Sequence, residues 1–165
     1  MGKVLTHILI LLFIIANSLC SCSTDGCTEN QSSIPLAGFY ATETGEAIAI
    51  TQLDIYGIGA TGDSLLLEGF STAKQVYLPL RSTITNTAFC FHYTQFGDSI
   101  TAYNDTVWFE YEPTPYFVSE ECGAMFQYKI TSIRHTNIII DSISLIDPEI
   151  TNIDVERIKI FFRTN

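Results

Sequence analysis

Hydrophobic residues recur at every second position through most of the chain after residue 34, and this period of two constrains the fold more than any other feature. Val107, Phe109 and Tyr111 alternate with Thr106, Trp108 and Glu110. The same spacing recurs at residues 76–80, 126–130 and 158–162. Successive side chains of a strand point to opposite faces, so each stretch predicts a strand with one buried face. Because no window shows a helical stripe, we expect an all-β protein.

Turn residues separate these stretches from further predicted strands at 34–42, 49–57, 63–69, 86–95 and 137–146. Seven to nine short strands at this spacing predict an antiparallel β-sandwich of the immunoglobulin-like kind. A small β-barrel is the alternative, because alternating strands occur in both architectures. Pro79 lacks an amide donor, which predicts that its strand lies at the edge of a sheet.

The N-terminus predicts export. Lys3 precedes an apolar run over 8–16, which is shorter than the roughly 20 residues that a spanning helix needs. Such a segment is typical of a signal peptide, here residues 1–21. Leu19-Cys20-Ser21-Cys22 resembles a bacterial lipobox, which predicts a lipid on Cys22; plain signal cleavage is the alternative. Residues 22–33 are expected to form a flexible tether and 34–165 a single domain.

Three cysteines remain after Cys22 in a compartment where disulfides form. Cys90 lies within a predicted strand and is expected to be a small buried side chain. Cys27 and Cys122 lie in irregular segments, and we predict that they pair. Pairings through Cys90 are the alternative.

Several short motifs resemble one known family. The stretch PYFVSEECG around Cys122, Tyr56-Gly57-Ile58-Gly59 and the terminal Ile158-Lys159-Ile160-Phe161-Phe162 are similar to an uncharacterised family of Bacteroidetes lipoproteins, catalogued as a domain of unknown function. The resemblance covers nearly the whole mature chain. It implies a lipid-anchored protein of a Gram-negative cell envelope, attached to the outer membrane, and it implies no activity.

The resemblance also suggests a modification. Exported proteins of these bacteria resemble substrates of an O-glycosylation system that recognises an aspartate, a hydroxyl residue and an apolar residue in sequence. Four such triplets occur, with Ser64, Ser99, Thr106 and Ser142 as candidate acceptors. The alternative is that the triplets only mark a turn followed by a strand.

Evidence for catalysis is sparse. His92 and His135 are isolated and lack the short spacing typical of a metal site, so we predict neither a metal nor a cofactor. The adjacent Glu120 and Glu121 point to opposite sides if extended, which makes them a poor acid–base pair. No nucleophile elbow or phosphate loop is present. A net charge of −10 repels nucleic acid, so no nucleic-acid partner is expected.

Two aromatic residues fall on the polar side of their strands. Exposed aromatics at such positions can hold a ligand, so Trp108 and Phe161 are candidate partner-binding residues. The alternative is burial in a two-sided strand or beneath a loop. We therefore expect a non-enzymatic envelope module that binds a protein or a glycan. An assembly subunit of an outer-membrane complex and a small envelope enzyme are the alternatives.

Overall fold

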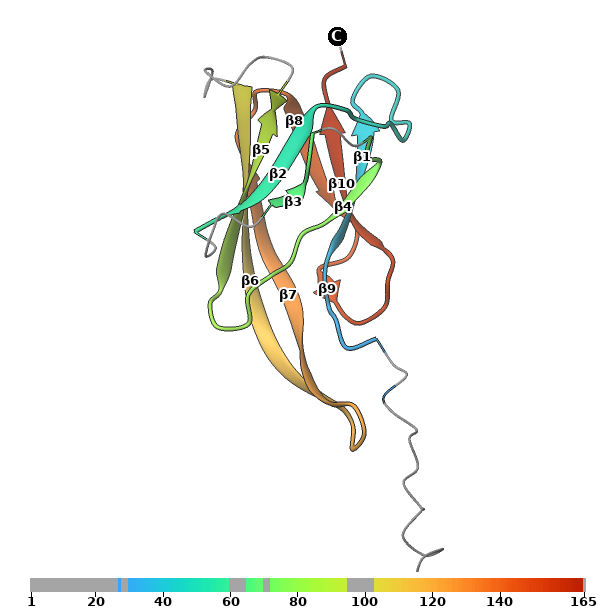
Figure 1. Ribbon diagram of the computed structural model, residues 1–165, viewed down its shortest axis with the longest axis vertical. Coiled ribbons are helices and arrows are strands. Elements are labelled where there is room, and N and C mark those ends of the chain that lie inside the picture. Colours follow the sequence, from blue (N-terminus) through green and yellow to red (C-terminus); the bar gives the residue numbers. More distant parts are fainter. Residues whose placement is uncertain (1–26, 28–29, 60–64, 70–71, 95–102, 165) are drawn as a thin grey trace, which may run out of the picture.

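The computed structural model describes residues 27, 30–59, 65–69, 72–94 and 103–164. These residues form ten strands and contain no α-helix (Figure 1). In chain order the strands are β1 (Leu36–Ala41), β2 (Leu53–Ile58), β3 (Leu65–Leu67), β4 (Gln75–Tyr77), β5 (Asn86–Tyr93), β6 (Asn104–Ser119), β7 (Gly123–His135), β8 (Ile140–Leu145), β9 (Glu149–Ile150) and β10 (Glu156–Phe162).

The strands form two packed sheets, which confirms the predicted β-sandwich. Neighbours in the smaller sheet follow the order β4, β1, β10, β8, and those in the larger sheet follow β3, β2, β5, β6, β7, β9. The described part of the chain holds ten strands instead of seven to nine, because it includes β9, a two-residue strand that lies outside the predicted ranges. Strand β4 is an edge strand, as Pro79 predicted, although it ends at Tyr77.

One pair of strands departs from the antiparallel arrangement. Strands β1 and β10 run parallel at the centre of the smaller sheet, with Phe39 opposite Ile160 and Tyr40 opposite Phe161. The hydroxyl of Tyr40 donates a hydrogen bond of 2.8 Å to Oε1 of Glu156 across this pair. Gly38 makes room for the Glu156 carboxylate, since a Cβ at that position would overlap it.

The core follows the predicted alternation. Val107, Phe109 and Tyr111 of β6 are buried, while Glu110 is exposed. The rings of Phe89 and Phe109 meet edge to face, with centroids 5.9 Å apart. The predicted inward residues of the other strands are also buried, namely Val76, Leu78, Leu80, Tyr128, Ile130, Ile158, Ile160 and Phe162. Burial of such side chains removes apolar area from water and stabilises the sandwich.

The long hairpin of β6 and β7 extends beyond the other strands (Figure 1). Strand β5 pairs with β6 only as far as Asn86, opposite Glu110, whereas β6 and β7 stay paired to Ser119 and Gly123. We call residues 112–127 the arm. Phe126, which the alternation predicted to be buried, is 40% exposed because it lies on the arm, beyond the neighbouring strands.

Two prolines protect one edge of the arm. The amide of Tyr111 donates to the carbonyl of Thr85, on the side of β6 that faces β5. Amide positions two and four residues later face the same side, and these are Pro113 and Pro115. Because proline has no amide hydrogen, this free edge cannot form a regular ladder with another strand.

A buried carboxylate organises the crossing from β7 to β8, which connects the two sheets. Asp105 is 0% exposed. Its Oδ1 accepts hydrogen bonds from the Thr136 hydroxyl at 2.7 Å and from the amide of Ile138 at 2.8 Å. Its Oδ2 accepts from the amides of Ile139 and Ile140 at 2.7 and 2.8 Å. The carboxylate thus satisfies donors that would otherwise be buried without partners.

Candidate functional site

Residues 30–33, here called the strap, lie against the loop between β9 and β10. The side-chain amide of Asn30 donates a hydrogen bond of 2.9 Å to the carbonyl oxygen of Asn152. The backbone amide of Ser32 donates to Oδ1 of Asn30 at 3.0 Å. This part of the predicted tether is therefore held to the body. Residues 22–26 and 28–29, together with the predicted signal peptide and Cys22, lie outside the described residues.

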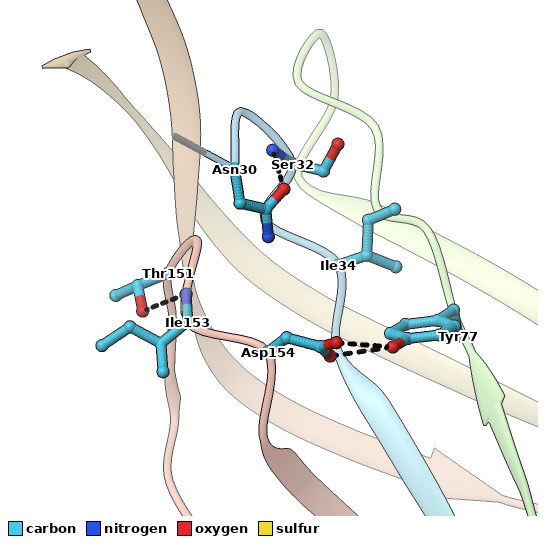
Figure 2. A pocket seen from close by; sticks show the side chains of 7 residues that line it. All are labelled: Asn30, Ser32, Ile34, Tyr77, Thr151, Ile153 and Asp154. Carbon is cyan, nitrogen blue, oxygen red and sulfur yellow. Dashed lines mark hydrogen bonds between the residues drawn. The ribbon is translucent and has the colours of Figure 1, made fainter. Parts of the chain in front are cut away.

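A cavity of about 240 Å³ opens beside the strap (Figure 2). The Tyr77 hydroxyl lies 2.8 and 3.0 Å from the two carboxylate oxygens of Asp154. This hydrogen bond raises the pKa of Tyr77. The phenol and the carboxylate are thus hydrogen-bonded to each other at the wall of the cavity. Its lining is Asn30, Ser32, Ile34, Tyr77, Thr151, Ile153 and Asp154.

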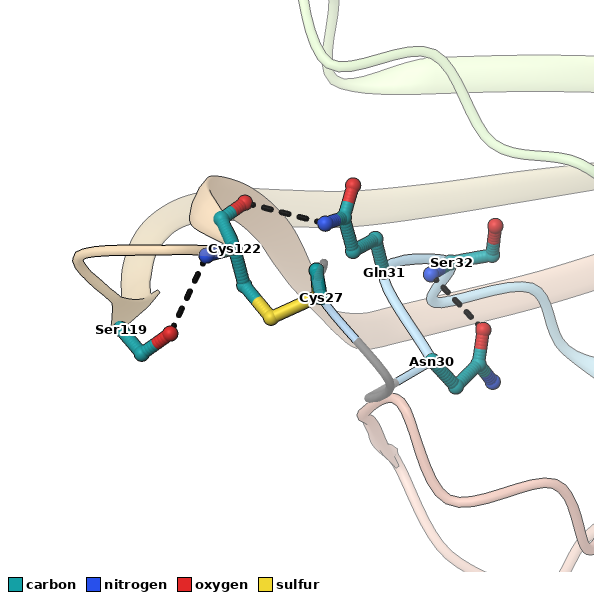
Figure 3. Close-up of a disulfide and its surroundings, with 6 residues drawn as sticks. All are labelled: Cys27, Asn30, Gln31, Ser32, Ser119 and Cys122. Atoms are coloured by element: carbon teal, nitrogen blue, oxygen red, sulfur yellow. Dashed lines mark hydrogen bonds between the residues drawn. A yellow bond between two sulfur atoms is a disulfide. The ribbon is translucent and has the colours of Figure 1, made fainter. Parts of the chain in front are cut away.

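The predicted disulfide between Cys27 and Cys122 is confirmed (Figure 3). Cys122 lies in the turn at the end of the arm, where its amide donates to Oγ of Ser119 at 3.1 Å. Its carbonyl oxygen accepts a hydrogen bond of 3.1 Å from the side chain of Gln31. The N-terminal segment is thus joined covalently to the tip of the arm. The alternative pairings through Cys90 are wrong, because Cys90 is a free, buried thiol.

Trp108 lines a groove of about 560 Å³ on the outer face of the larger sheet. Its ring is half-buried, on the side of β6 opposite Val107 and Phe109. The guanidinium carbon of Arg134 lies 5.8 Å from the ring centroid, and Nη2 of Arg134 lies 3.4 Å from Oε1 of Glu110. The remaining lining residues are Thr85, Asn86, Phe109, Tyr111, Glu112 and Thr131. The groove therefore combines an aromatic ring, a planar cation, carboxylates, hydroxyls and an amide.

Phe161 lies on the other side of the sandwich. It alternates with the buried Ile160 and Phe162 of β10, so its ring is on the outer face of the smaller sheet. It packs on Tyr40, with centroids 5.6 Å apart, and the Lys159 ammonium lies 4.7 Å from the Tyr40 centroid. Trp108 and Phe161 consequently lie on opposite outer faces and cannot form one binding site.

The candidate glycan acceptors differ in accessibility. Ser142 is exposed on the edge strand β8, next to the Asp141 carboxylate, which lies 2.7 Å from Arg163 Nη2. Thr106 is half-buried in the interior strand β6, and the Asp105 of its triplet is wholly buried. Ser64 and Ser99 lie outside the described residues.

The predicted titratable residues do not converge. Nδ1 of His92 lies 2.7 Å from Oδ1 of Asn104, and Nδ1 of His135 lies 2.6 Å from the carbonyl oxygen of Thr136. Glu120 and Glu121 are exposed in the turn beside the disulfide. Within the described residues, no group of three histidine, cysteine or acidic side chains is placed to hold a metal ion. The same residues include no helix long and apolar enough to cross a membrane.

Asp105 is the polar residue whose importance the sequence interpretation missed. It was grouped with the candidate acceptor triplets, yet it shares its strand face with Val107, Phe109 and Tyr111. A carboxylate in register with a buried apolar face is a signal that could have identified it, because a buried charge requires several donors.

Comparison with known proteins adds the family. No curated protein and no solved structure matches the chain. A family model does match, over residues 52–162, which include all strands from β2 to β10. Since this match covers more than half of the chain, the protein belongs to the Family of unknown function (DUF6452).

Proposed function

We propose that this protein is a lipid-anchored, non-enzymatic component of the cell envelope that binds a glycan or protein partner in the Trp108 groove. The observation that carries the proposal is the position of Trp108, Arg134 and Glu110 together in a groove on an outer sheet face. Aromatic rings stack on the apolar faces of sugars and side chains, while guanidinium and carboxylate groups bond to hydroxyls and amides.

Attachment to the membrane is inferred from the N-terminal sequence. The apolar run over 8–16 is followed by Leu19-Cys20-Ser21-Cys22, so Cys22 is the residue that would carry the lipid. The outer membrane of a Gram-negative bacterium is the proposed location. The disulfide at Cys27 agrees with an oxidising compartment.

Binding is favoured over catalysis by the environment of the ionisable groups. Arg134 and Glu110 are exposed and paired with each other, which suits recognition of a polar partner. The two imidazoles of His92 and His135 are each hydrogen-bonded outside the groove lining. In the part of the chain that the structure describes, the lining of the groove contains no histidine and no cysteine.

The test uses native envelopes and two matched variants. Full-length tagged protein is cross-linked in its host, and the captured proteins and glycans are quantified by mass spectrometry. Trp108→Ala should reduce capture of the partner roughly tenfold, because aromatic anchors dominate binding energy. Phe161→Ala removes an aromatic ring from the opposite face and should leave capture unchanged. If the two variants reduced capture equally, binding in the Trp108 groove would be contradicted. Capture of a stable protein assembly that neither variant affects would favour the assembly-subunit alternative.

The lipid anchor is tested separately. The Cys22→Ser variant should lose the diacyl mass on the mature N-terminus and appear in the soluble periplasmic fraction. The wild-type protein should remain in the outer membrane. A wild-type N-terminus without a diacyl mass, or a Cys22→Ser protein that still carries one and stays in the membrane, would refute lipidation at this residue.

We further propose Ser142 as an O-glycan acceptor, because it is the exposed hydroxyl of a triplet on an edge strand. The same proposal extends to Ser64, Ser99 and Thr106 on their sequence alone. Peptide mass spectrometry of the native protein should find hexose or deoxyhexose on the peptide that contains Ser142. Its absence there would exclude this acceptor.

A further inference from the structure

The end of the arm presents aromatic side chains to solvent on both faces. Phe117 is 64% exposed and Phe126 is 40% exposed, and their cross-strand register places both on the same face. Tyr116, on the other face, is 46% exposed. Large exposed aromatic groups at one projecting tip are costly in water, which indicates a surface that they contact.

The N-terminal segment is attached to this same tip. Cys27 is bonded to Cys122, and the strap is hydrogen-bonded to the Cys122 carbonyl through Gln31. Four residues separate Cys27 from Cys22, the proposed lipid-bearing residue. A fully extended chain spans about 3.6 Å per residue, so Cys22 lies no more than about 18 Å from Cys27, which is bonded to the tip. Any membrane that holds Cys22 is therefore within reach of the arm.

Other features of the arm favour contact through the faces at its end. Pro113 and Pro115 block the free edge of β6, which disfavours pairing with a strand of another chain. Glu120 and Glu121 are exposed in the turn. Carboxylates remain hydrated, so they permit contact at headgroup depth and disfavour deep insertion or an anionic surface.

We propose that the end of the arm is a membrane-contacting foot, in which Phe117, Phe126 and Tyr116 enter the interfacial layer of a largely zwitterionic bilayer. This inference rests on the proposed lipid anchor. The lipid supplies attachment, and the disulfide keeps the aromatic tip beside it. The foot then fixes how the sandwich, with its Trp108 groove, is oriented above the membrane. Tyr116 suits this depth because it has both a ring and a hydroxyl, and the rings of Phe117 and Phe126 add apolar surface that is buried there.

The test places a single fluorescent residue at each end of the molecule. Lipidated full-length protein carrying Trp108→Phe, which removes the chain's one tryptophan, is reconstituted into phosphatidylcholine vesicles. Phe117→Trp provides the reporter on the foot. Glu46→Trp provides the matched control, in the exposed loop after β1 at the end opposite the arm (Figure 1). Brominated acyl chains should reduce the fluorescence of the Phe117→Trp protein roughly twofold and leave the Glu46→Trp protein unaffected.

Further outcomes separate the foot from the anchor. Adding Cys27→Ser and Cys122→Ser should abolish the quenching while the protein still floats with the vesicles. If the reporter proteins float but are quenched equally, the foot is refuted and the anchor stands. If lipid is absent from Cys22 and the protein does not float, the proposed anchor is refuted, and the foot, which rests on it, is refuted with it. A blue shift of the Phe117→Trp emission that depends on protein concentration without vesicles would instead assign the tip to a second copy of the chain and overturn the proposal.

Discussion

The phenol of Tyr93 donates a hydrogen bond of 2.9 Å to Oδ2 of Asp105, and the two side chains are 3% and 0% exposed. Tyr93 is the last residue of β5 and Asp105 is the second of β6, so the bond connects neighbouring strands of the larger sheet. The same carboxylate oxygen accepts from two amides in the crossing to β8. The buried carboxylate of Asp105 therefore connects β5 and β6 of the larger sheet to the beginning of β8 in the smaller sheet.

Asp105→Asn should destabilise the protein by about 3 to 5 kcal/mol, because a carboxamide offers one acceptor oxygen and turns an NH2 group toward buried donors. The free energy of unfolding is measured in urea. Asp141→Asn is the matched control, since its partly exposed ion pair with Arg163 contributes less than about 1 kcal/mol. Similar losses in the two variants would show that Asp105 is not structurally special.

Tyr93→Phe should cost about 1 to 2 kcal/mol at neutral pH, since it leaves the carboxylate with four of its five donors. Burial and the nearby Asp105 charge raise the pKa of Tyr93 above its usual value of 10.0. Because the pKa of Tyr93 is higher in the folded than in the unfolded state, its neutral phenol stabilises the fold fully below pH 10. This stabilisation falls as the pH rises above 10. Wild-type stability should therefore decline by about 1.4 kcal/mol per pH unit more steeply than that of Tyr93→Phe above pH 10. If the stability of the wild type and of Tyr93→Phe changed equally with pH above 10, the raised pKa of Tyr93 would be contradicted.

The double variant Cys27→Ser, Cys122→Ser should lose about 4 kcal/mol of stability, because the bond closes a loop between residues 95 positions apart. Urea unfolding under non-reducing conditions measures the change. Cys90→Ser, which affects no disulfide, gives the background effect of removing a cysteine. A reducing agent should shift the wild type to the double variant's midpoint, and no shift would be the contrary result.

Gly38→Ala should cost about 1 kcal/mol, because the added methyl group displaces the Glu156 carboxylate from the Tyr40 hydroxyl. The displaced side chain is flexible at its end, which limits the loss. In a Glu156→Ala background the same substitution should be nearly neutral. A double-mutant cycle by urea unfolding measures this coupling, and additive effects would show that the contact is unimportant.

Cys90 should react with a thiol reagent at least ~10-fold more slowly in the folded protein than in urea. Its side chain is buried, and burial raises the pKa of the thiol, which reduces the thiolate that reacts. Absorbance of the released chromophore gives the rate. Complete labelling of the folded protein at the rate found in urea would contradict its burial.

The sequence predicted features that are local to one strand. Alternation identified the buried faces of β6 and β10, and the irregular surroundings of Cys27 and Cys122 predicted their bond correctly. Alternation depends only on residues two positions apart in the sequence. The disulfide was predictable because three cysteines allow few pairings. Phe126 was predicted to be buried for the same reason, but its exposure depends on where the neighbouring strand β5 begins, and alternation within β7 does not report this.

Relations between strands were harder to predict. Alternation shows that Trp108 and Phe161 point away from the core, but it does not assign their strands to sheets, so their separation onto opposite faces was not foreseen. Alternation also does not predict the parallel pairing of β1 with β10. A strand shows the same pattern of burial whether its neighbour runs parallel or antiparallel. The strap was missed because its hydrogen bonds to Asn152 and Cys122 join it to residues more than 90 positions away.

The pairing of β1 with β10 has a consequence for how the protein is made. The first strand of the fold lies between β4 and β10, so its central position in the smaller sheet is complete only when residues 156–162 have emerged. Contacts between such distant segments form slowly, since a long chain must be closed before they are gained. Until β10 has been made, β1 lacks one of its two neighbours, and its unpaired edge is open to strands of other chains if synthesis stops early.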